Sequence, residues 1–295
     1  MSDNQKTVFL FPGQGSAYAG MGQDILQKAH DIAKSVFETA SEILGYNLFH
    51  VTENAEKLAH TRYAQPAIAA VSVISAKIRQ QRGETCEAVA GHSLGEYPAM
   101  QFSGIITLEG MFELLKIRGE AMESAAEAQK GVMYAVMGAD IFTIEKICAD
   151  TPGLVVPANF NSAAQTVIAG LSEPCETAAQ KLSAEGAKTI KLAVAGAFHT
   201  ELMKSAADTM LEAAKRFTFK TPEIPFYSNL TGARLYDFSD FAQKIADHIT
   251  SPVRFKQELE SLYSDGFTNY LEAAPGKVLT GCVKKTLKGV EAKSF

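Results

Sequence analysis

Residues 86–100, CEAVAGHSLGEYPAM, contain the pattern G-x-S-x-G centred on Ser93. An apolar run at residues 88–90 precedes the pattern and helix-compatible residues follow it, which is typical of a strand, a tight turn and a helix. Small residues are needed two positions either side of the serine, because a side chain there would clash with the neighbouring strand and helix. We therefore predict an elbow that exposes the Ser93 hydroxyl. The backbone N–H of Leu94, near a helix start, would point to where an oxyanion could form.

A second glycine-rich segment lies near the amino terminus. Residues 7–11 form a short apolar run that ends at Pro12 and Gly13, which predicts a buried strand leading into the loop FPGQGSAYAGMG. The G-x-G in this loop resembles the start of a dinucleotide-binding fingerprint. However, the third glycine is misplaced and no acidic residue ends a second strand at the expected spacing. We therefore expect no dinucleotide cofactor.

Length and composition indicate an enzyme-sized globular chain. It has 295 residues, 46% hydrophobic and 21% charged, and its net charge of −5 argues against general affinity for nucleic acid. Four widely spaced cysteines without a C-x-x-C pattern favour free thiols in a reducing compartment. The segment MSDNQKTVFLF has too short an apolar run for a signal peptide, and no run of about 18 apolar residues occurs elsewhere. We expect a soluble, cytoplasmic protein that does not enter a membrane.

Hydrophobic periodicity predicts helices on both sides of the elbow. Residues 24–44 have helical spacing and are predicted as a helix in two pieces. Pro66 is predicted to open a long apolar helix as a first-turn proline. Residues 108–121 place Arg118 beside an otherwise buried stripe, where an arginine needs an anionic partner.

The middle of the chain changes character. Residues 131–196 predict the order β-α-β-β-α-β, the split βαβ pattern of a ferredoxin-like subdomain. A strong amphipathic helix, a strand candidate at PEIPFYSNLTG and a final strand-turn-helix at GFTNYLEAAPGKVLTG follow. We therefore predict an α/β fold with a mainly parallel sheet, in which residues 1–128 and 198–295 form a hydrolase-like core and residues 129–197 an inserted ferredoxin-like subdomain.

Ser93 needs a neighbouring base to act as a nucleophile near neutral pH. Four of the six histidines, His30, His50, His60 and His248, have no companion signal and are predicted to lie at the surface. His92 is adjacent to Ser93, so its side chain is expected to point away. His199 lies where the inserted subdomain returns to the core, which favours it as the base, although a helix-cap histidine is the alternative.

No acid is well placed to complete a triad. Asp140 and Asp150 are the candidates between Ser93 and His199, but both fall in the inserted subdomain. A backbone carbonyl can also hold an imidazole tautomer, so a serine–histidine dyad is chemically sufficient.

Eight segments in order along the chain resemble the malonyl-CoA:acyl carrier protein transacylases, members of the acyltransferase family of fatty acid and polyketide synthesis. They are FPGQGS (11–16), TRYAQPA (61–67), GHSLGEY (91–97), Arg118, NFNSAAQTVIAG (159–170), GAFH (196–199), SPVRF (251–255) and EAAPGKVLTG (272–281). The resemblance spans nearly the whole chain. It departs from the family pattern at Ala17, at Ala163 and Ala164, and at Ala274, none of which touches the implied chemistry.

The resemblance assigns roles to individual residues. Ser93 would be the nucleophile and His199 the base, with the backbone N–H groups of Gln14 and Leu94 as the oxyanion hole. Arg118 would clamp the free carboxylate of malonate, since a planar guanidinium donates two parallel hydrogen bonds. The remaining implied site residues are Gln65 and Asn161 lining the cavity, Phe198 crowding the space of a 2-methyl branch, and the main-chain carbonyl near Arg254 orienting His199.

The resemblance also implies a reaction and partners. Malonyl would pass from malonyl-CoA to the phosphopantetheine thiol of acyl carrier protein through a malonyl-serine intermediate, in a ping-pong cycle serving fatty acid synthesis. A free-standing acyltransferase of a polyketide pathway, or a serine thioesterase or hydrolase, remains the alternative. A monomer with no bound cofactor, metal or nucleic acid is expected. Because carrier proteins are acidic, Lys284, Lys285 and Lys288 are a candidate docking patch, with a solvated helix face as the alternative.

Overall fold

The computed structural model describes residues 5–295, so the first four residues of the segment that argued against a signal peptide lie outside the described residues. The first part of the chain forms β1 (Lys6–Phe11), α1 (Met21–Lys28), α2 (His30–Leu44), α3 (Leu48–Thr52), α4 (Ala55–Leu58), α5 (Thr61–Gln81), β2 (Ala88–Gly91), α6 (Glu96–Phe102) and α7 (Leu108–Ala128). The middle part forms β3 (Gly131–Met137), α8 (Ile141–Ala149), β4 (Val155–Ser162), β5 (Gln165–Leu171), α9 (Ser172–Ala184) and β6 (Lys188–Lys191). The last part forms α10 (Lys204–Ala214), β7 (Tyr227–Ser228), β8 (Ala233–Arg234), α11 (Phe241–Thr250), α12 (Phe255–Ser264), β9 (Phe267–Glu272), α13 (Val278–Thr286) and β10 (Glu291–Lys293). Three short 3₁₀ turns are η1 (Gln14–Ser16), η2 (Ser93–Gly95) and η3 (Glu201–Met203). The first two contribute residues to the cleft described below.

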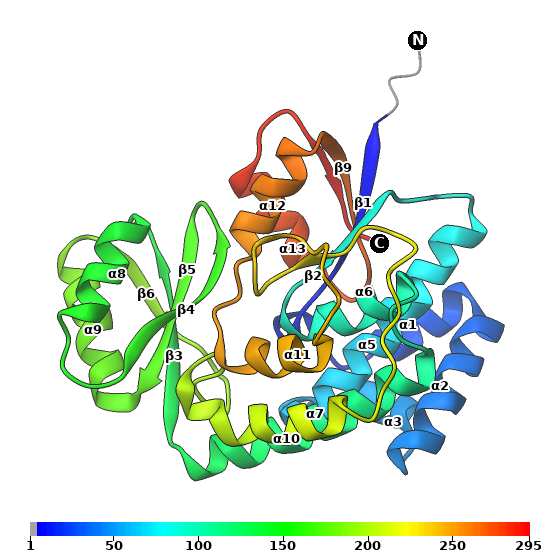
Figure 1. Cartoon of the computed structure of the whole chain (residues 1–295), viewed down its shortest axis with the longest axis horizontal. Helices are drawn as coiled ribbons and strands as arrows, with labels where there is room; N and C mark the ends of the chain where they lie inside the picture. The colour runs from blue at the N-terminus through cyan, green and yellow to red at the C-terminus, as the bar shows by residue number, and fades with distance from the viewer. Residues whose placement is uncertain (1–4) are drawn as a thin grey trace.

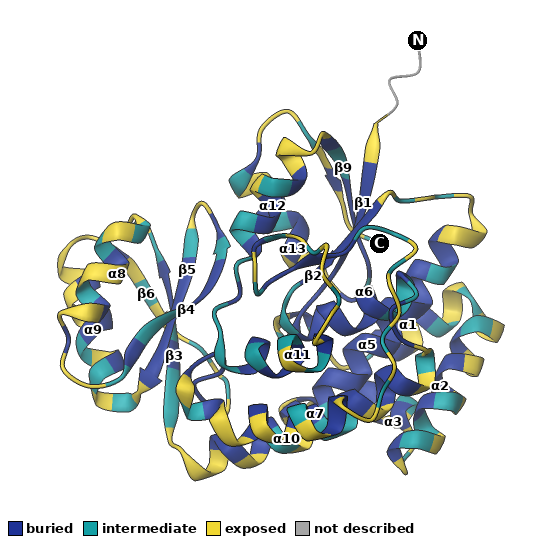
Figure 2. Ribbon diagram, viewed as in Figure 1, coloured by how far each residue is buried: buried dark blue, intermediate teal, exposed yellow. Residues whose placement is uncertain are grey.

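A parallel four-stranded sheet lies at the centre of the larger lobe, in the order β10-β9-β1-β2. Alternate residues of β1 face opposite sides of it. Phe9 and Phe11 join the core formed with the helices of the amino-terminal half, whereas Val8 and Leu10 join a second core formed with α12 and α13. Both faces are therefore covered, as a parallel sheet requires, and β2 and most of β1 are dark blue in the burial view of Figure 2.

A second four-stranded sheet forms the smaller lobe, on the left of Figure 1. Its strands are antiparallel, in the order β4-β5-β3-β6, with α8 and α9 on one face over a separate core. The lobes are also linked by backbone pairing, because Phe160 N donates to Val253 O and Val253 N donates to Ala158 O, at 2.8 and 2.9 Å. The smaller lobe is thus held against the segment that leads into α12.

The described elements confirm most of the predicted ones and correct two. The helical pattern at residues 24–44 forms two helices, α1 and α2, as expected. However, α5 begins at Thr61, so Pro66 lies inside the helix and not in its first turn. A proline there cannot donate to the carbonyl of Arg62, and the helix tolerates this loss because the residues around it are almost all buried. The strand candidate at 222–232 forms only the two-residue β7.

Within residues 5–295, no helix is both long and apolar enough to cross a membrane.

Candidate active site

The elbow around Ser93 joins β2 to α6 at the edge of the parallel sheet. Ser93 has φ = 53°, in the left-handed region that few non-glycine residues adopt. A Cβ on Gly91 would lie 2.2 Å from the carbonyl carbon and oxygen of Gly95, and one on Gly95 would lie 2.0 Å from the carbonyl oxygen of Phe11. The predicted need for small residues on both sides of the serine therefore has a direct steric cause in this fold.

His199 faces Ser93 within the same lobe, at the base of the cleft. The Ser93 Oγ and His199 Nε2 atoms are 2.8 Å apart, and the imidazole is almost fully buried. Like Ser93, His199 has a positive φ, 60°. Two side chains 106 positions apart in the sequence are thus brought into hydrogen-bonding contact by two unusual backbone conformations.

Backbone carbonyls orient the imidazole. His199 Nδ1 lies 3.1 Å from His248 O and 3.2 Å from Ser251 O. The carbonyl near Arg254 was expected in this role, and the structure corrects the residue: the carbonyl is that of Ser251, the first residue of the same SPVRF segment. Arg254 O instead accepts from Glu258 N, because Arg254 caps the start of α12. Carbonyls only accept, so Nδ1 carries the proton and Nε2 is left to accept from the Ser93 hydroxyl.

The environment of His199 favours the neutral imidazole. Burial, followed by the nearby His248 and Arg118, holds the pKa of His199 well below its usual 6.5. A neutral imidazole can take a proton from a serine hydroxyl, whereas an imidazolium cannot. Near pH 7 the histidine is therefore in the form that a general base requires.

Arg118 emerges from α7 into the base of the same site. Its guanidinium is 1% exposed, donates to Gln65 Oε1 at 2.5 Å and to Ser93 Oγ at 3.2 Å, and lies over the Tyr97 ring. Burial lowers the pKa of Arg118. Among residues 5–295 no carboxylate forms an ion pair with Arg118, and its Nε has no hydrogen-bond partner. A buried cation whose direct hydrogen-bond partners are all neutral is costly, and a ligand anion would relieve that cost.

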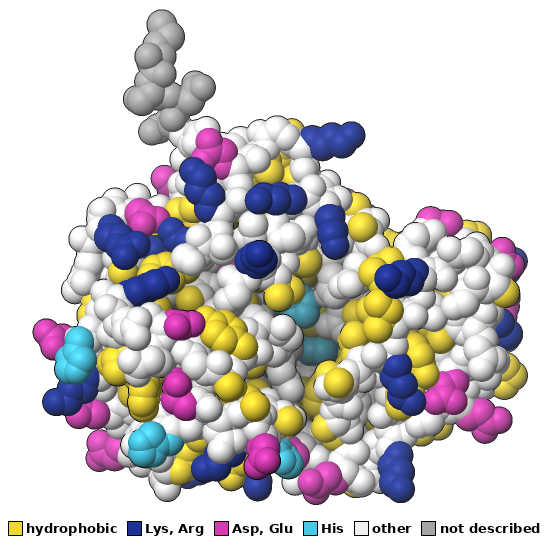
Figure 3. Space-filling view, turned by 180° about the vertical axis from the view of Figure 1, so that it is seen from behind, with side chains coloured by type: hydrophobic (Ala, Val, Ile, Leu, Met, Phe, Trp, Pro, Cys, Tyr) yellow, Lys and Arg dark blue, Asp and Glu magenta, His cyan; other side chains and the backbone are white. Residues whose placement is uncertain are grey.

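A cavity of about 380 Å³ lies between the two lobes, above Ser93. The larger lobe contributes Gln14, Leu94, Arg118, Phe198 and His199, and the smaller lobe contributes Met133, Asn159, Asn161 and Val167. Figure 3 shows this cavity as a hollow with histidine atoms at its base. Gln65, which was expected to line the cavity, is instead fully buried behind Arg118 and holds its guanidinium.

The structure changes the prediction for one histidine. His30, His50 and His60 are exposed as expected, but His248 is 3% exposed and pairs with Glu96, so its surface assignment is wrong. It lies on the inner face of the amphipathic helix α11, where the sequence pattern alone could have placed it. The His92 ring lies in the cavity wall, where it packs against Phe255 and places Nε2 2.7 Å from Asn161 Oδ1 and not at the Ser93 hydroxyl.

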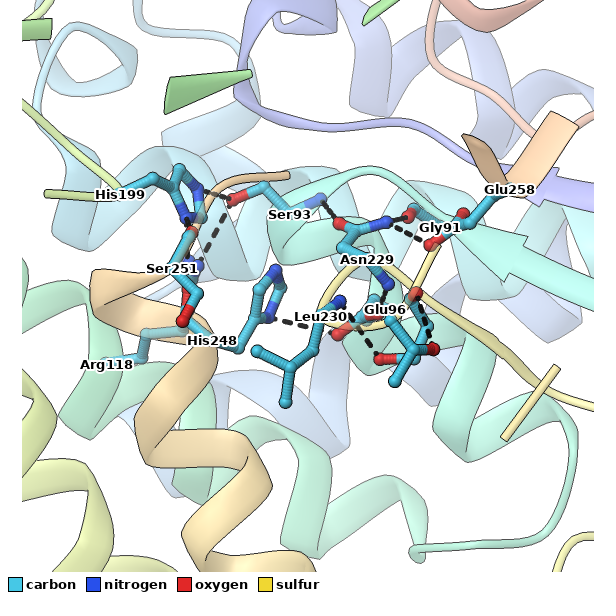
Figure 4. Close-up of polar contacts among 12 residues, drawn as sticks. Gly91, Ser93, Glu96, Arg118, His199, Asn229, Leu230, His248, Ser251 and Glu258 are labelled. Atoms are coloured by element: carbon cyan, nitrogen blue, oxygen red, sulfur yellow. Dashed lines mark hydrogen bonds and ion pairs between the residues drawn. The ribbon is translucent and has the colours of Figure 1, made fainter. Parts of the chain in front are cut away.

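Three buried polar residues below the elbow were missed by the sequence analysis. Asn229 accepts from Ser93 N at 2.6 Å and donates to Gly91 O and Glu258 Oε1, while Glu96 accepts from Asn229 N at 2.6 Å (Figure 4). Burial and the neighbouring Glu96 raise the pKa of Glu258 well above its usual value. The only sequence signal was polar residues inside apolar segments, at YSNL and GEYPAM.

The site pairs a strained serine with a buried neutral histidine, in a cleft with a backbone turn beside it. Serine acyltransferases and serine hydrolases share this arrangement. Comparison with known proteins decides between these classes. The family described as acyl transferase domain matches residues 8–294. The chain belongs to this family and is an acyltransferase.

Relatives of known name match along nearly the full chain. The malonyl CoA-acyl carrier protein transacylase of Bacillus subtilis (strain 168) is 36% identical over 95% of this chain and 90% of the relative. The protein of the same name from Escherichia coli (strain K12) is 36% identical over 98% and 95%. In structure, MCAT from Streptococcus pneumoniae is similar with a TM-score of 0.93 at 38% identity over 98% of this chain and 96% of that one.

Proposed function

We propose that this protein transfers malonyl from malonyl-CoA to the phosphopantetheine thiol of acyl carrier protein, through a malonyl-serine intermediate. The observation that carries the substrate is Arg118, a buried guanidinium 3.2 Å from Ser93 Oγ without an anionic partner among residues 5–295. A thioester bearing a free carboxylate supplies that partner and places its carbonyl at the serine. The names of the relatives support the same substrate.

The first half-reaction acylates Ser93. His199 Nε2 takes the hydroxyl proton as Oγ attacks the thioester carbonyl, and the backbone N–H groups of Leu94 and Gln14, which line the cavity, stabilise the oxyanion. When the tetrahedral intermediate collapses, the C–S bond breaks and the coenzyme A thiolate leaves with the proton from His199. Malonyl remains as an ester of Ser93, its carboxylate bound by Arg118.

The second half-reaction reverses these steps with a different thiol. His199 takes the proton of the phosphopantetheine thiol, and the thiolate attacks the malonyl ester. The C–O bond to Ser93 breaks and the proton returns to Oγ. The apolar walls of the cavity from both lobes limit access of water to the ester, which favours transfer to a thiol over hydrolysis.

The domain organisation that we propose is a hydrolase-like core of residues 1–128 and 198–295 with a ferredoxin-like subdomain of residues 129–197. The strand order β4-β5-β3-β6 with α8 and α9 on one face supports the second part. Phe198, 7% exposed in the cavity wall, would crowd a 2-methyl branch and so favour malonyl over methylmalonyl by about 1–3 kcal/mol. Asn161 would contact the substrate from the smaller lobe.

Acyl carrier protein is the proposed acceptor. A structure described as a type II PKS acyl-carrier protein in complex with its malonyl-transacylase is similar with a TM-score of 0.94 at 33% identity over 98% of this chain and 96% of that one. Fatty acid synthesis is the role we propose, with a polyketide carrier protein as the alternative acceptor. One chain contains Ser93, His199 and Arg118 in a single cleft, so a monomer is sufficient. The four free thiols favour a reducing compartment such as the cytoplasm.

Intact-protein mass spectrometry after incubation with malonyl-CoA tests the intermediate. The parent protein should gain one malonyl group and Ser93→Ala none. The control is Ser103→Ala, which removes another buried hydroxyl at the end of α6 and should still gain it. A malonyl adduct on Ser93→Ala would contradict the proposal. Faster transfer of malonyl to water than to a phosphopantetheine thiol would favour the thioesterase alternative.

A further inference from the structure

The nucleophile and the base are joined by a closed ring of hydrogen bonds that passes beneath the elbow. Ser93 N donates to Asn229 Oδ1, Asn229 N donates to Glu96 Oε1, and His248 Nδ1 lies 3.0 Å from Glu96 Oε2. His199 Nδ1 contacts His248 O, and His199 Nε2 contacts Ser93 Oγ, which closes the ring. The same five residues can be followed in Figure 4.

Glu96 occupies a special place in this ring. Glu96 is the only carboxylate in the ring. It is the first residue of α6 and is 6% exposed. Each of its two oxygens contacts a different half of the site. Through Asn229, Oε1 leads to the backbone of the nucleophile. Through His248, Oε2 leads to the carbonyl that orients the base. One half comprises residues 91–96 and Asn229, and the other comprises His199 and His248. No regular secondary structure joins the two halves.

Both ends of the ring are backbone conformations that need support. Ser93 and His199 are two of the three non-glycine residues with positive φ among residues 5–295. Such conformations persist only when the surroundings determine them. Asn229 holds the peptide N–H of Ser93 directly, and the ring fixes the position of the carbonyl opposite His199 Nδ1.

The groups around Glu96 fit a held carboxylate. His248 Nδ1 and Asn229 N provide one donor to each oxygen, and Arg118 lies nearby as a cation. Glu258, the other carboxyl group beside Asn229, shares that residue but is outside the ring. Among residues 5–295 the Nε2 atom of His248 has no hydrogen-bond partner, so its ring proton lies on Nδ1, where Glu96 Oε2 accepts it. The other tautomer becomes favourable only when residue 96 offers a donor.

We propose that Glu96 is the positioning residue of this enzyme: by holding Asn229 and His248 together it sets the distance between the Ser93 hydroxyl and the His199 imidazole. Glu96 does not touch the substrate, so its loss alters the rate of acylation and leaves substrate affinity, set by Arg118, in place. The inference rests on the proposed acyl-serine chemistry, but its central readout, serine reactivity, does not require malonyl.

Two substitutions of Glu96 separate positioning from general stability. Glu96→Ala opens the ring and should lower kcat about 100-fold with KM for malonyl-CoA within about twofold, the size expected for misplaced reacting groups. The second-order rate of Ser93 labelling by an uncharged fluorophosphonate should fall by the same factor. Glu96→Gln should retain more than a third of the parent rate, because its amide can accept from Asn229 N and donate to His248 Nδ1 once that histidine is protonated on Nε2.

The control and a second ring variant complete the experiment. Val36→Ala, in the buried face of α2 far along the chain from the site, should lower the melting temperature without changing labelling. If Glu96→Ala does not fold, His248→Leu takes its place, because it also opens the ring. This variant should show the same loss of Ser93 labelling. The double variant Glu96→Ala/His248→Leu should label no more slowly than the slower single variant, because the ring is already open.

Any one of three results would overturn the inference. Glu96→Ala could be labelled at the parent rate, or Glu96→Gln could be labelled as slowly as Glu96→Ala. The third is a double variant in which the losses of labelling rate from the two single variants add. Failure of the proposed function would look different. In that case malonyl would not form an adduct with the parent protein, while fluorophosphonate labelling would still report on the ring.

Discussion

At the scale of single residues, Ser93, which we propose as the nucleophile, is contacted on three of its sides. His199 Nε2 accepts from its hydroxyl, Arg118 Nη2 donates to the same oxygen, and Asn229 Oδ1 fixes its backbone N–H. The histidine makes the oxygen more nucleophilic, and the arginine stabilises negative charge on it. The site thus needs no carboxylate in direct contact with His199, because two carbonyls select its tautomer.

The low pKa of His199 predicts an unusual pH profile. Burial lowers that pKa below 6.5, so the neutral, active form persists as pH falls and is lost only below the ordinary titration range. The rate of Ser93 labelling by an uncharged fluorophosphonate should stay constant from pH 8 to pH 6.5 and decline at lower pH. A midpoint above 6.5 would contradict the assignment of a buried neutral base.

Arg118 predicts selectivity for acyl groups that carry a carboxylate. Arg118→Ala should lower kcat/KM for malonyl-CoA roughly 30- to 1,000-fold, because the carboxylate loses its charged partner. This corresponds to a loss of about 2–4 kcal/mol in transition-state stabilisation. The same change should lower the rate with acetyl-CoA far less, because acetyl has no free carboxylate and that reaction loses only the hydrogen bond from Arg118 to Ser93 Oγ. Arg118→Lys is the matched variant: it keeps the charge without the planar fork and should recover only part of the malonyl rate. Equal losses for malonyl and acetyl would show that Arg118 is only structural.

Sequence patterns predicted Ser93, His199 and Arg118 because each interrupts or ends a regular segment. They did not predict Asn229, Glu96 or His248 as parts of one network. These three lie in different elements, and only the fold brings them together. A carbonyl opposite His199 Nδ1 was expected from the SPVRF segment only through the family resemblance. The pattern of residues could not name Ser251 or His248, because any residue type carries a carbonyl and its direction is set by the end of α11.

At the scale of elements, the sharp turn between β2 and α6 depends on glycine for steric reasons. Gly95 has helical dihedral angles, φ = −62° and ψ = −18°, so a larger residue there is excluded by contact and not by conformation. The carbonyl oxygen of Phe11 would lie 2.0 Å from its Cβ. The glycine-rich loop after β1 and the serine elbow are therefore packed directly on one another.

Gly95→Ala should consequently separate β1 from the elbow. We expect a loss of about 1–3 kcal/mol in the free energy of unfolding, the usual cost of overpacking, together with a loss of acyl transfer. Gly281→Ala is the control within α13, where a Cβ meets nothing within 4 Å and should add up to about 1 kcal/mol of stability. Chemical denaturation measures both. A Gly95→Ala protein as stable and active as the parent would contradict the steric explanation.

Helix and strand positions followed from the hydrophobic periodicity where elements were long. The predicted start of the helix at Pro66 was wrong. Prolines prefer the first turn of a helix, but the free energy gained by burying the residues along α5 outweighs this local preference. It also failed at residues 222–232, where apolar residues form a short pairing and a loop carrying Asn229 in place of a strand. In that loop the amide of Asn229, and not a strand partner, satisfies the buried backbone of the elbow.

At the scale of the whole molecule, the cleft depends on both lobes. His92, next to Ser93, contacts Asn161 of β4, and Asn161 in turn donates to Gln165 of β5. The backbone pairing between β4 and Val253 holds the smaller lobe against the segment that contains Ser251. The sequence predicted two units and a cleft but not these links, because they join residues that are far apart in the chain.

The distribution of charge gives the last prediction, which concerns the carrier protein. Lys284, Lys285 and Lys288 are exposed at the end of α13, whose inner residues Leu279 and Cys282 line the cavity. Figure 3 shows Lys and Arg side chains around the hollow on a chain of net charge −5. An acidic carrier protein docked there would place its phosphopantetheine arm at the cavity. Steering by such surface charges acts mainly on association and weakens with salt.

Replacing these three lysines with glutamate should therefore raise KM for acyl carrier protein about 10-fold at low ionic strength, with kcat nearly unchanged. The increase should shrink as salt is added, because added ions screen exposed charges. The matched control replaces Lys34, Lys146 and Lys215, which are equally exposed on other surfaces and do not line the cavity, and should leave KM unchanged. Steady-state transfer assays with purified carrier protein measure both triple variants. An unchanged KM in the first variant, or an equal increase in the control, would mean that the lysines near the end of α13 are only a solvated helix face.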